Sequence, residues 1–322
     1  MEYIKKNKNG DVKFTFIKSN ELPDLPITTP LTFAFIGYDL LLAKKKSGDW
    51  DILGGKVEKD EFWIDALKRE ALEEAGVYID NIDILGYVLA EHDNPDISFP
   101  KKSILPVTIS FVKEVLYDWK KYETLDRRLF RKKHALKEFE TKNDNKQIYR
   151  IFNEIVYPYL TGEYSVEFGL ADSIKDLTTY PVTQTMSFIS VNDKFLVVRD
   201  YDEKEFSLVG GGCELDENIF SSAKREILEE AQLRVDELEF VSSTVVKLYN
   251  NNKHVVSKLQ QIKFVGKKND YDINSFVPRK NGFETEEVKL VQMEELLKTK
   301  ILNNQNGRAI VESLNKKINE NK

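Results

Sequence analysis

The chain has little cysteine and little histidine, and the shortage of cysteine excludes whole classes of protein. Its 322 residues include a single cysteine, Cys213, and three histidines. One thiol cannot form an intramolecular disulfide or a multi-cysteine zinc site, so packing must stabilise the folded state. We interpret Cys213 as a small core residue rather than a nucleophile.

Long apolar runs and an excess of positive charge are also missing. No stretch approaches the roughly 18 apolar residues of a membrane helix, and no apolar segment follows the basic residues of MEYIKKNKNGDVKF as in a secretory signal. We therefore expect a soluble, cytoplasmic protein without membrane contact. The net charge of -6 argues against stable nucleic-acid binding. The short basic run at 127–134 is interpreted as a solvated helix face.

One segment of the sequence occurs twice. Residues 55–77 follow the pattern Gly, five residues, Glu, seven residues, Arg-Glu-x-x-Glu-Glu, and residues 211–233 follow it again. Similarity surrounds both copies, because residues 30–45 and 181–199 both read as strand, turn and strand. An amphipathic helix is expected late in each half, at about 131–157 and 293–318. Repetition on this scale predicts two domains of one α/β fold.

Three segments are expected along the chain. Before the repeat, Lys8-Asn9-Gly10 is typical of a β-hairpin turn. The boundary between the domains is predicted near residue 162, where Pro158 and Gly162 would interrupt a helix. The predicted segments are a hairpin extension at 1–22, a first domain at 23–162 and a second domain at 163–322.

The repeated segment predicts a metal site. If residues 65–75 are helical, Glu70, Glu73 and Glu74 lie at i, i+3 and i+4 and share one helix face. Three crowded carboxylates on a partly buried face need a divalent cation, and oxygen ligands indicate Mg²⁺ or Mn²⁺. The metal-ligand candidates of the second copy are Glu226, Glu229 and Glu230.

Other residues of the segment support these carboxylates. Arg69 can clamp them, Glu61 can accept from the backbone near the helix start, and Gly54 and Gly55 let the backbone turn and approach a ligand. Gly76 fits a left-handed helix cap. The second copy keeps these residues as Arg225, Glu217, Gly210 and Gly211, whereas Gln232 replaces the capping glycine. Every carboxylate survives, so metal binding there is expected to persist.

With the glycines, the glutamates and their spacing, both segments resemble the Nudix box, and the chain is similar to a tandem Nudix hydrolase. The resemblance implies two α/β/α sandwiches with mixed sheets and Mg²⁺-dependent attack of water on a diphosphate linkage. It also implies a nucleotide or a nucleoside diphosphate derivative as substrate. It makes Glu70, Glu73, Glu74 and their counterparts metal ligands, with Arg69 and Glu61 in support.

The general base is left open between two acids in each domain. The base of the family lies in the box or in a later loop or strand, and the chain repeats an acidic segment downstream. Glu123 or Asp126 would serve the first site, and Glu284 or Glu287 the second. The alternative is that these are surface acids at the start of a strand or helix.

The sequence gives weaker support to two other functions. The second domain, less readily the whole chain, could be a non-catalytic nucleotide sensor. An isoprenoid diphosphate isomerase is disfavoured, because its cysteine and histidine metal arrangement is missing and the histidines are scattered. The first domain is the expected site of turnover. Neither the substrate nor the oligomeric state follows from the sequence, although a homo-oligomer is compatible with it.

Overall fold

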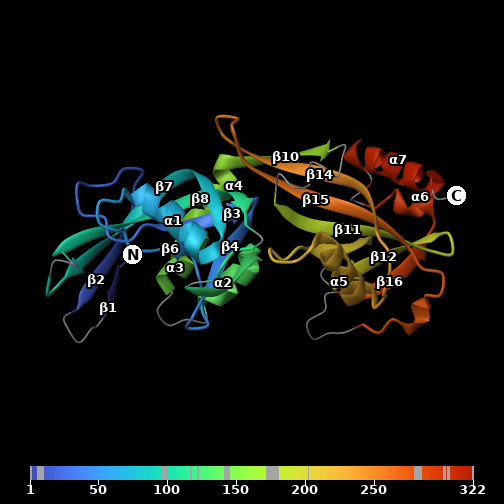
Figure 1. Ribbon diagram of the computed structural model, residues 1–322, viewed down its shortest axis with the longest axis horizontal. Coiled ribbons are helices and arrows are strands. Elements are labelled where there is room, and N and C mark those ends of the chain that lie inside the picture. Colours follow the sequence, from blue (N-terminus) through green and yellow to red (C-terminus); the bar gives the residue numbers. More distant parts are fainter. Residues whose placement is uncertain are drawn as a thin grey trace. The chain divides into compact units, whose positions relative to one another are not determined.

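The computed structural model divides the chain into two compact units (Figure 1). The first unit comprises Met1–Val166 and Leu248–Lys258, and the second comprises Glu167–Lys247 and Leu259–Lys322. The short hairpin segment Leu248–Lys258 thus groups with the first unit, which the boundary predicted from the sequence does not include. The structure describes residues 2–5, 11–95, 100–116, 118–121, 123–140, 146–171, 181–201, 203–278, 285–299, 302 and 305–320.

The first unit is built on a nine-stranded mixed sheet. Its main path is β1-β2-β7-β8-β3-β4-β5, with β6 paired to β3 and β9 paired to β4. β3 and β8 are parallel, whereas β3 and β4 are antiparallel. The strands are β1 (Glu2–Lys5), β2 (Val12–Lys18), β3 (Leu31–Ile36), β4 (Asp39–Lys45), β5 (Trp50–Asp51), β6 (Leu53–Gly54), β7 (Val77–His92), β8 (Lys102–Val115) and β9 (Thr124–Phe130).

The N-terminal extension forms the edge of this sheet. β1 and β2 are antiparallel, with Glu2 opposite Thr15 and Lys5 opposite Val12. β2 in turn pairs along its whole length with β7. The expected turn residues Lys8, Asn9 and Gly10 lie outside the described residues. The extension therefore continues the first sheet instead of standing apart from it.

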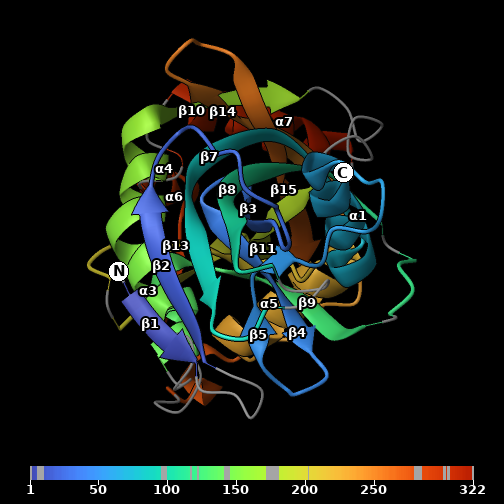
Figure 2. The ribbon, with the colours of Figure 1, turned by 90° about the vertical axis from the view of Figure 1, so that its left-hand side faces the viewer.

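Helices cover both faces of the first sheet (Figure 2). α1 (Trp63–Ala75) lies on one side, and a group of short helices lies on the other. Phe33 of β3 packs against this group through Phe152, which also contacts Phe139. The group consists of α2 (Lys132–Glu140), α3 (Lys146–Ile151), a π-helical turn (Phe152–Val156) and α4 (Tyr157–Glu163). The first unit is therefore an α/β/α sandwich.

The helix expected at 131–157 is instead found as α2 and as a continuous helical stretch at 146–163, made of α3, the π-helical turn and α4. α4 also runs through Pro158 and Gly162, where an interruption was expected. Pro158 lies in the first turn of α4. This helix directly follows the π-helical turn, where the regular i→i−4 hydrogen bonding is already disrupted, so the missing N–H of proline costs little there. The expectation of an interruption was wrong, because Val156 and Tyr157 have right-handed helical backbone angles and the helix continues into α4.

The second unit repeats the arrangement with seven strands. The sheet has the order β10-β14-β15-β11-β13-β12-β16, with β11 also paired to β12. β11 and β15 are parallel, whereas β11 and β13 are antiparallel, so this sheet is also mixed. The strands are β10 (Tyr164–Ala171), β11 (Val182–Val191), β12 (Lys194–Asp200), β13 (Ser207–Gly212), β14 (Glu239–Asn250), β15 (Val255–Lys267) and β16 (Thr285–Val291).

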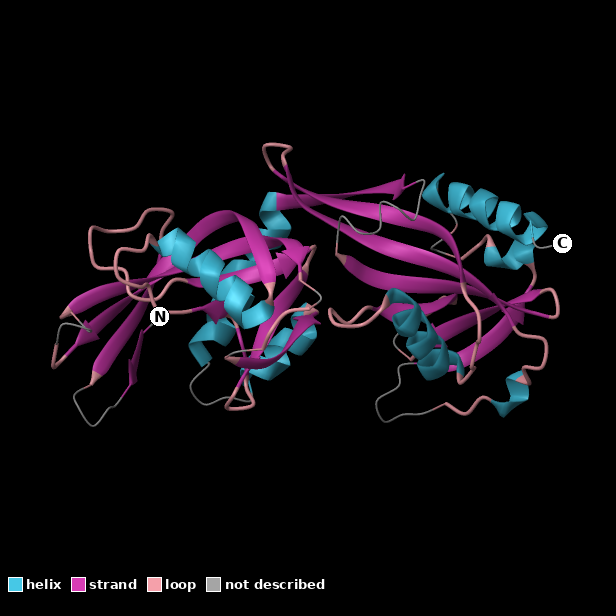
Figure 3. Cartoon of the chain, viewed as in Figure 1, coloured by secondary structure: helices cyan, strands magenta, loops and turns pink. Residues whose placement is uncertain are grey.

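Two hydrophobic clusters hold helices on opposite faces of the second sheet (Figure 3). α5 (Ile219–Ala231) packs in one, together with the buried Cys213. Burial raises the pKa of the Cys213 thiol to about 11, which supports its interpretation as a core residue. The opposite cluster contains residues of α6 (Met293–Leu296) and α7 (Gln305–Glu320). Elsewhere in the unit, a short 3-10 turn spans Ile273–Ser275. Among the described residues, no helix is long and apolar enough to cross a membrane.

Candidate active site

Helix α1 positions the acids of the first repeated segment. It begins at Trp63 after the extended Phe62, and it ends at Gly76, whose φ of 58° and ψ of 41° are left-handed as predicted. Glu70 and Glu74 point toward the sheet and are buried, whereas the side chain of Glu73 is 43% exposed. The three predicted ligands therefore occupy two different environments on one helix.

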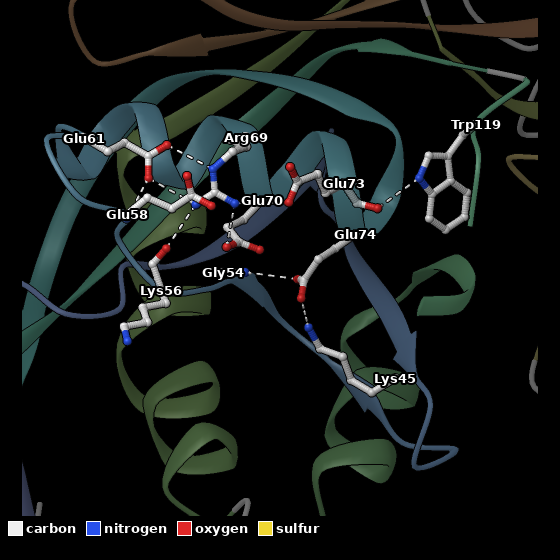
Figure 4. Close-up of polar contacts among 10 residues, drawn as sticks. All are labelled: Lys45, Gly54, Lys56, Glu58, Glu61, Arg69, Glu70, Glu73, Glu74 and Trp119. Carbon is white, nitrogen blue, oxygen red and sulfur yellow. Dashed lines mark hydrogen bonds and ion pairs between the residues drawn. The ribbon is translucent and has the colours of Figure 1, made fainter. Parts of the chain in front are cut away.

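Arg69 links the glutamates of this segment (Figure 4). Its Nε and Nη2 donate to the two carboxylate oxygens of Glu61 at 2.9 and 3.1 Å. Nη1 donates to Glu70 at 2.9 Å and to Glu73 at 3.0 Å, and Nη2 also donates to the carbonyl of Lys56. These hydrogen bonds lower the pKa of the Glu61 carboxyl. One guanidinium thus fixes three carboxylates and the preceding loop.

The two glycines that precede α1 make room for its carboxylates. A Cβ atom on Gly55 would collide with the Glu70 carboxyl group. Gly54 has a φ of 148°, and its N–H donates to Oε2 of Glu74 at 3.2 Å. Both glycines were predicted to approach a ligand. In the structure each of them also shapes the position of one glutamate.

We expect Gly55→Ala to displace the Glu70 carboxylate and to destabilise the first unit by about 1–2 kcal/mol, as overpacking does. Urea unfolding followed by tryptophan fluorescence measures this, because all three tryptophans lie in the first unit. Gly162→Ala is the matched control, since a Cβ there has open space around it. Equal stability of the Gly55→Ala variant and the wild type would contradict the packing role.

Three acids form a cluster whose geometry can hold a metal ion. Carboxylate oxygens of Glu70, Glu74 and Glu123 all lie within 4.8 Å of one another. Burial raises the pKa of Glu70 and of Glu74, although Arg69 and a lysine oppose the shift. We call Glu70, Glu74 and Glu123 the carboxylate cluster. It consists of oxygen donors alone, which suits Mg²⁺ or Mn²⁺ and does not suit softer metals.

The structure separates the two predicted bases of the first unit. Glu123 belongs to the carboxylate cluster and is exposed. Asp126, on β9, accepts a hydrogen bond from the N–H of Arg127 at 2.9 Å and lies 4.0 Å from Arg128. A cavity of about 480 Å³ opens beside the cluster, lined by Lys56, Val57, Glu58, Lys59, Arg69, Glu70, Glu73 and Glu123. Glu123, unlike Asp126, therefore faces the cavity.

The second repeated segment reproduces the network of the first. Nε and Nη2 of Arg225 donate to Glu217 at 3.1 and 2.9 Å, and Nη1 donates to Glu226 at 2.7 Å and Glu229 at 3.1 Å. The N–H of Gly210 donates to Oε2 of Glu230 at 2.8 Å. Burial raises the pKa of Glu226.

The glycine after Gly210 is closely packed, as is its counterpart Gly55. A Cβ on Gly211 would lie 2.5 Å from a carboxylate oxygen of Glu226. Such a distance is well below a normal van der Waals contact, so an alanine would displace that carboxylate. The two boxes thus share their packing as well as their hydrogen bonds.

The end of α5 differs from the end of α1. Gln232 adopts the left-handed conformation, with a φ of 53°, at the place of Gly76. Its side chain donates to the carbonyl of Val277 at 2.6 Å and accepts from the N–H of Val277 at 3.3 Å. Tyr271 donates to the carbonyl of Ala231 at 2.9 Å. These bonds offset the roughly 1 kcal/mol cost of a non-glycine residue in this conformation.

Of the two predicted bases of the second unit, only Glu287 lies among the described residues. Glu287 is exposed and pairs with Arg199 at 2.7 Å. Glu284 lies outside the described residues. The hydroxyl oxygen of the next residue, Thr285, lies 3.4 Å from a carboxylate oxygen of Asp200.

Residues outside the repeated segment hold the first site in place, and the sequence did not single them out. The hydroxyl of Thr124 donates to the carbonyl of Glu74 at 2.6 Å, and Trp119 donates to the carbonyl of Glu73 at 3.1 Å. Lys45 forms an ion pair with Glu74. The repeated Glu-Thr pair could have indicated Thr124, whereas nothing in the sequence indicates the contacts of Lys45 and Trp119.

Arg127 corrects the interpretation of the basic run as a solvated helix face. Arg127 lies in strand β9 and is buried, with 3% of its surface exposed. Nη1 donates to the carbonyls of Ala75 at 2.6 Å and Gly76 at 3.1 Å, and Nη2 donates to that of Leu116 at 2.7 Å. A cation at the C-terminus of α1 complements the helix dipole and satisfies carbonyls that the helix leaves free.

Comparison with known proteins gives matches in both halves. Residues 36–151 and 182–312 match the family model described as the NUDIX domain. A curated 8-oxo-dGTP diphosphatase from Buchnera aphidicola is 44% identical over 45 residues, which make up 14% of this chain and 36% of that protein. The chain therefore spans about a third of the length of this curated relative.

Solved structures show the same kind of similarity. The pyrophosphohydrolase of Bacillus subtilis is 21% identical and covers 40% of this chain and 77% of its own, with a TM-score of 0.31. The NUDIX domain of Shewanella oneidensis NrtR, solved with ADP ribose, is 12% identical and covers 46% of this chain and 99% of its own, with a TM-score of 0.32. Because the family model matches most of both halves, the chain belongs to the NUDIX family and carries the family's domain twice.

Proposed function

We propose that the first unit hydrolyses a diphosphate linkage in a nucleotide or a nucleoside diphosphate derivative, with Mg²⁺ or Mn²⁺ as cofactor. The observation that carries this proposal is the carboxylate cluster of Glu70, Glu74 and Glu123 at the edge of an open cavity. Membership of the NUDIX family supports the reaction class. The 8-oxo-dGTP diphosphatase that resembles part of the chain supports a nucleotide substrate.

The side chains around the cavity suit a bound diphosphate. Glu70 and Glu74 would hold the cation, and Glu73 would help through its contact with Arg69. When bound, the cation supplies charge neutralisation for the diphosphate and lowers the pKa of the attacking water. Lys56 and Lys59 line the cavity, so their ammonium groups would pair with phosphate oxygens.

Glu123 is our candidate for the general base of the first unit. Its carboxylate would accept a proton from the water as the new oxygen–phosphorus bond forms and the bond to the bridging oxygen breaks. Because Glu123 is exposed, the proton can then pass to solvent. Arg69 keeps Glu70 and Glu73 fixed throughout, which reduces the cost of reorganising the site.

We assign cation binding to the second unit as well. Glu226, Glu229 and Arg225 have the same mutual contacts as their counterparts in the first unit. The role of base there falls on Glu284 or Glu287. A unit that binds a cation and a nucleotide without turnover is the second candidate function of this half, and paired variants distinguish the two.

The test is a hydrolysis assay with Mg²⁺ and a panel of nucleoside triphosphates, ADP-ribose, NADH, dinucleoside polyphosphates and nucleotide sugars. We expect Glu73→Gln/Glu74→Gln to lower kcat for the best substrate by a factor of about 100. Glu229→Gln/Glu230→Gln reports the contribution of the second unit in the same way. Cation-independent turnover, or full activity after all four substitutions, would overturn the proposal.

A further inference from the structure

One strand position carries side chains of opposite charge in the two units. In the first unit, Lys45 lies opposite Thr124 after an irregularity in the pairing of β4 with β9. In the second, Asp200 lies opposite Thr285 after the same irregularity in the pairing of β12 with β16. The backbone thus places a lysine and an aspartate at equivalent positions beside the two repeated segments.

A turn fixes each of these residues at the end of its strand. The carbonyl of Lys45 accepts from the N–H of Gly48 at 2.8 Å, and the carbonyl of Asp200 accepts from the N–H of Glu203 at 3.1 Å. Their side chains then differ in what they do. Lys45 forms an ion pair with Glu74. In contrast, a carboxylate oxygen of Asp200 lies 3.4 Å from the hydroxyl oxygen of Thr285.

The ion pair of Lys45 engages a residue of the carboxylate cluster. The side chain of Glu74 is 5% exposed, so its carboxylate has little access to water. A divalent cation on Glu74 would share that carboxylate with an ammonium group and would be repelled by it. In the second unit, the equivalent position carries a negative charge, which attracts a cation instead.

We propose that Lys45 weakens divalent-cation binding in the first unit and that Asp200 strengthens it in the second, so that the two boxes load at different cation concentrations. This inference rests on the proposed cation sites. Asp200 acts through its charge and not as a ligand. Lys45 acts as a positioning residue on Glu74, since its ammonium group must share or release that carboxylate when a cation binds.

The experiment measures Mn²⁺ binding to the full chain from the electron paramagnetic resonance signal of free Mn²⁺. Glu226→Gln/Glu230→Gln leaves the first site, and Glu70→Gln/Glu74→Gln leaves the second. We expect the first site to bind Mn²⁺ more weakly than the second. In the chain with the first site alone, Lys45→Met should tighten Mn²⁺ binding about tenfold. In the chain with the second site alone, Asp200→Lys should weaken it by at least as much, since two unit charges change.

Matched controls separate this effect from a general change in charge. Lys44→Met removes the same charge one residue away, where the ammonium group lies over the ring of Trp50. Glu203→Lys makes the same change of charge as Asp200→Lys within the adjacent turn. Lys45→Arg keeps the positive charge and should retain the wild-type affinity. Far-ultraviolet circular dichroism of each variant confirms that it is folded.

The outcomes separate the inference from the function on which it rests. If the glutamine variants leave Mn²⁺ binding intact, the proposed cation sites are wrong. If they abolish binding at their own sites, but Lys45→Met behaves like Lys44→Met, the cation sites stand and the role of Lys45 is overturned. Equal affinity of the two wild-type sites would overturn it as well.

Discussion

Replacing Glu123 by glutamine should lower kcat of the first unit by a factor of about 10²–10⁴, the usual range for a general base. The amide cannot accept the proton of the attacking water, although its shape is nearly that of the carboxylate. The measurement is kcat for the best substrate of the panel, in a chain that carries Glu226→Gln/Glu230→Gln so that the second unit contributes nothing.

Asp126→Asn is the matched control for this prediction. Asp126 accepts from a backbone N–H on β9 and is not part of the carboxylate cluster, so its amide variant should keep kcat within a few-fold of the parent chain. Mn²⁺ titration of both variants shows whether the loss comes from chemistry or from cation binding. If kcat falls further in Asp126→Asn than in Glu123→Gln, Asp126 and not Glu123 is the general base.

The sequence was sufficient for the parts of the site that local spacing determines. Helix α1 and its left-handed cap follow from the apolar period and from Gly76. The burial of Glu70 and Glu74 follows from their helical spacing once one face of α1 packs on the sheet. The repeat predicted two like domains because the order of elements in the two halves is the same, and the resemblance to the Nudix family implied the α/β/α sandwich with a mixed sheet.

Contacts across the sheet could not be predicted in this way. The approach of Lys45 to Glu74 depends on an irregularity in strand pairing, and a shift of one residue would turn its side chain to the other face. Arg127 lies in a basic run and is nevertheless buried at the end of α1. Both cases depend on register and on tertiary packing, which a single sequence does not specify.

Lys263 of the second unit is a buried lysine, and no carboxylate among the described residues pairs with it. It is 2% exposed, and Nζ donates to the hydroxyl of Thr244 at 2.6 Å and to the carbonyl of Gln261 at 3.1 Å. Strand register gives its counterpart in the first unit. Lys263 lies opposite Met186, the partner of Gly210, whereas Val107 lies opposite Leu31, the partner of Gly54. An apolar position of the first core is therefore a lysine in the second.

Burial lowers the pKa of Lys263 to about 7. The unfolded chain keeps the ordinary lysine value near 10.4, so between these two pH values the unfolded state binds more protons than the folded state. The free energy of unfolding must then rise with pH, starting near pH 7. The full difference corresponds to about 5 kcal/mol, of which about 1.5 kcal/mol falls between pH 7 and 8.5.

Lys263→Met should abolish this rise, because methionine fills a similar volume and does not titrate. Cys213 measures the stability of the second unit directly, since it is the chain's single cysteine and is buried in that unit. The rate of thiol labelling, corrected for the reactivity of a free thiol at each pH, gives the opening free energy. The difference between wild type and Lys263→Met should shrink steadily from pH 7 to 8.5, with contributions common to both chains cancelling. A constant difference across this window would show that Lys263 is charged in the folded protein, stabilised by groups other than Thr244 and Gln261.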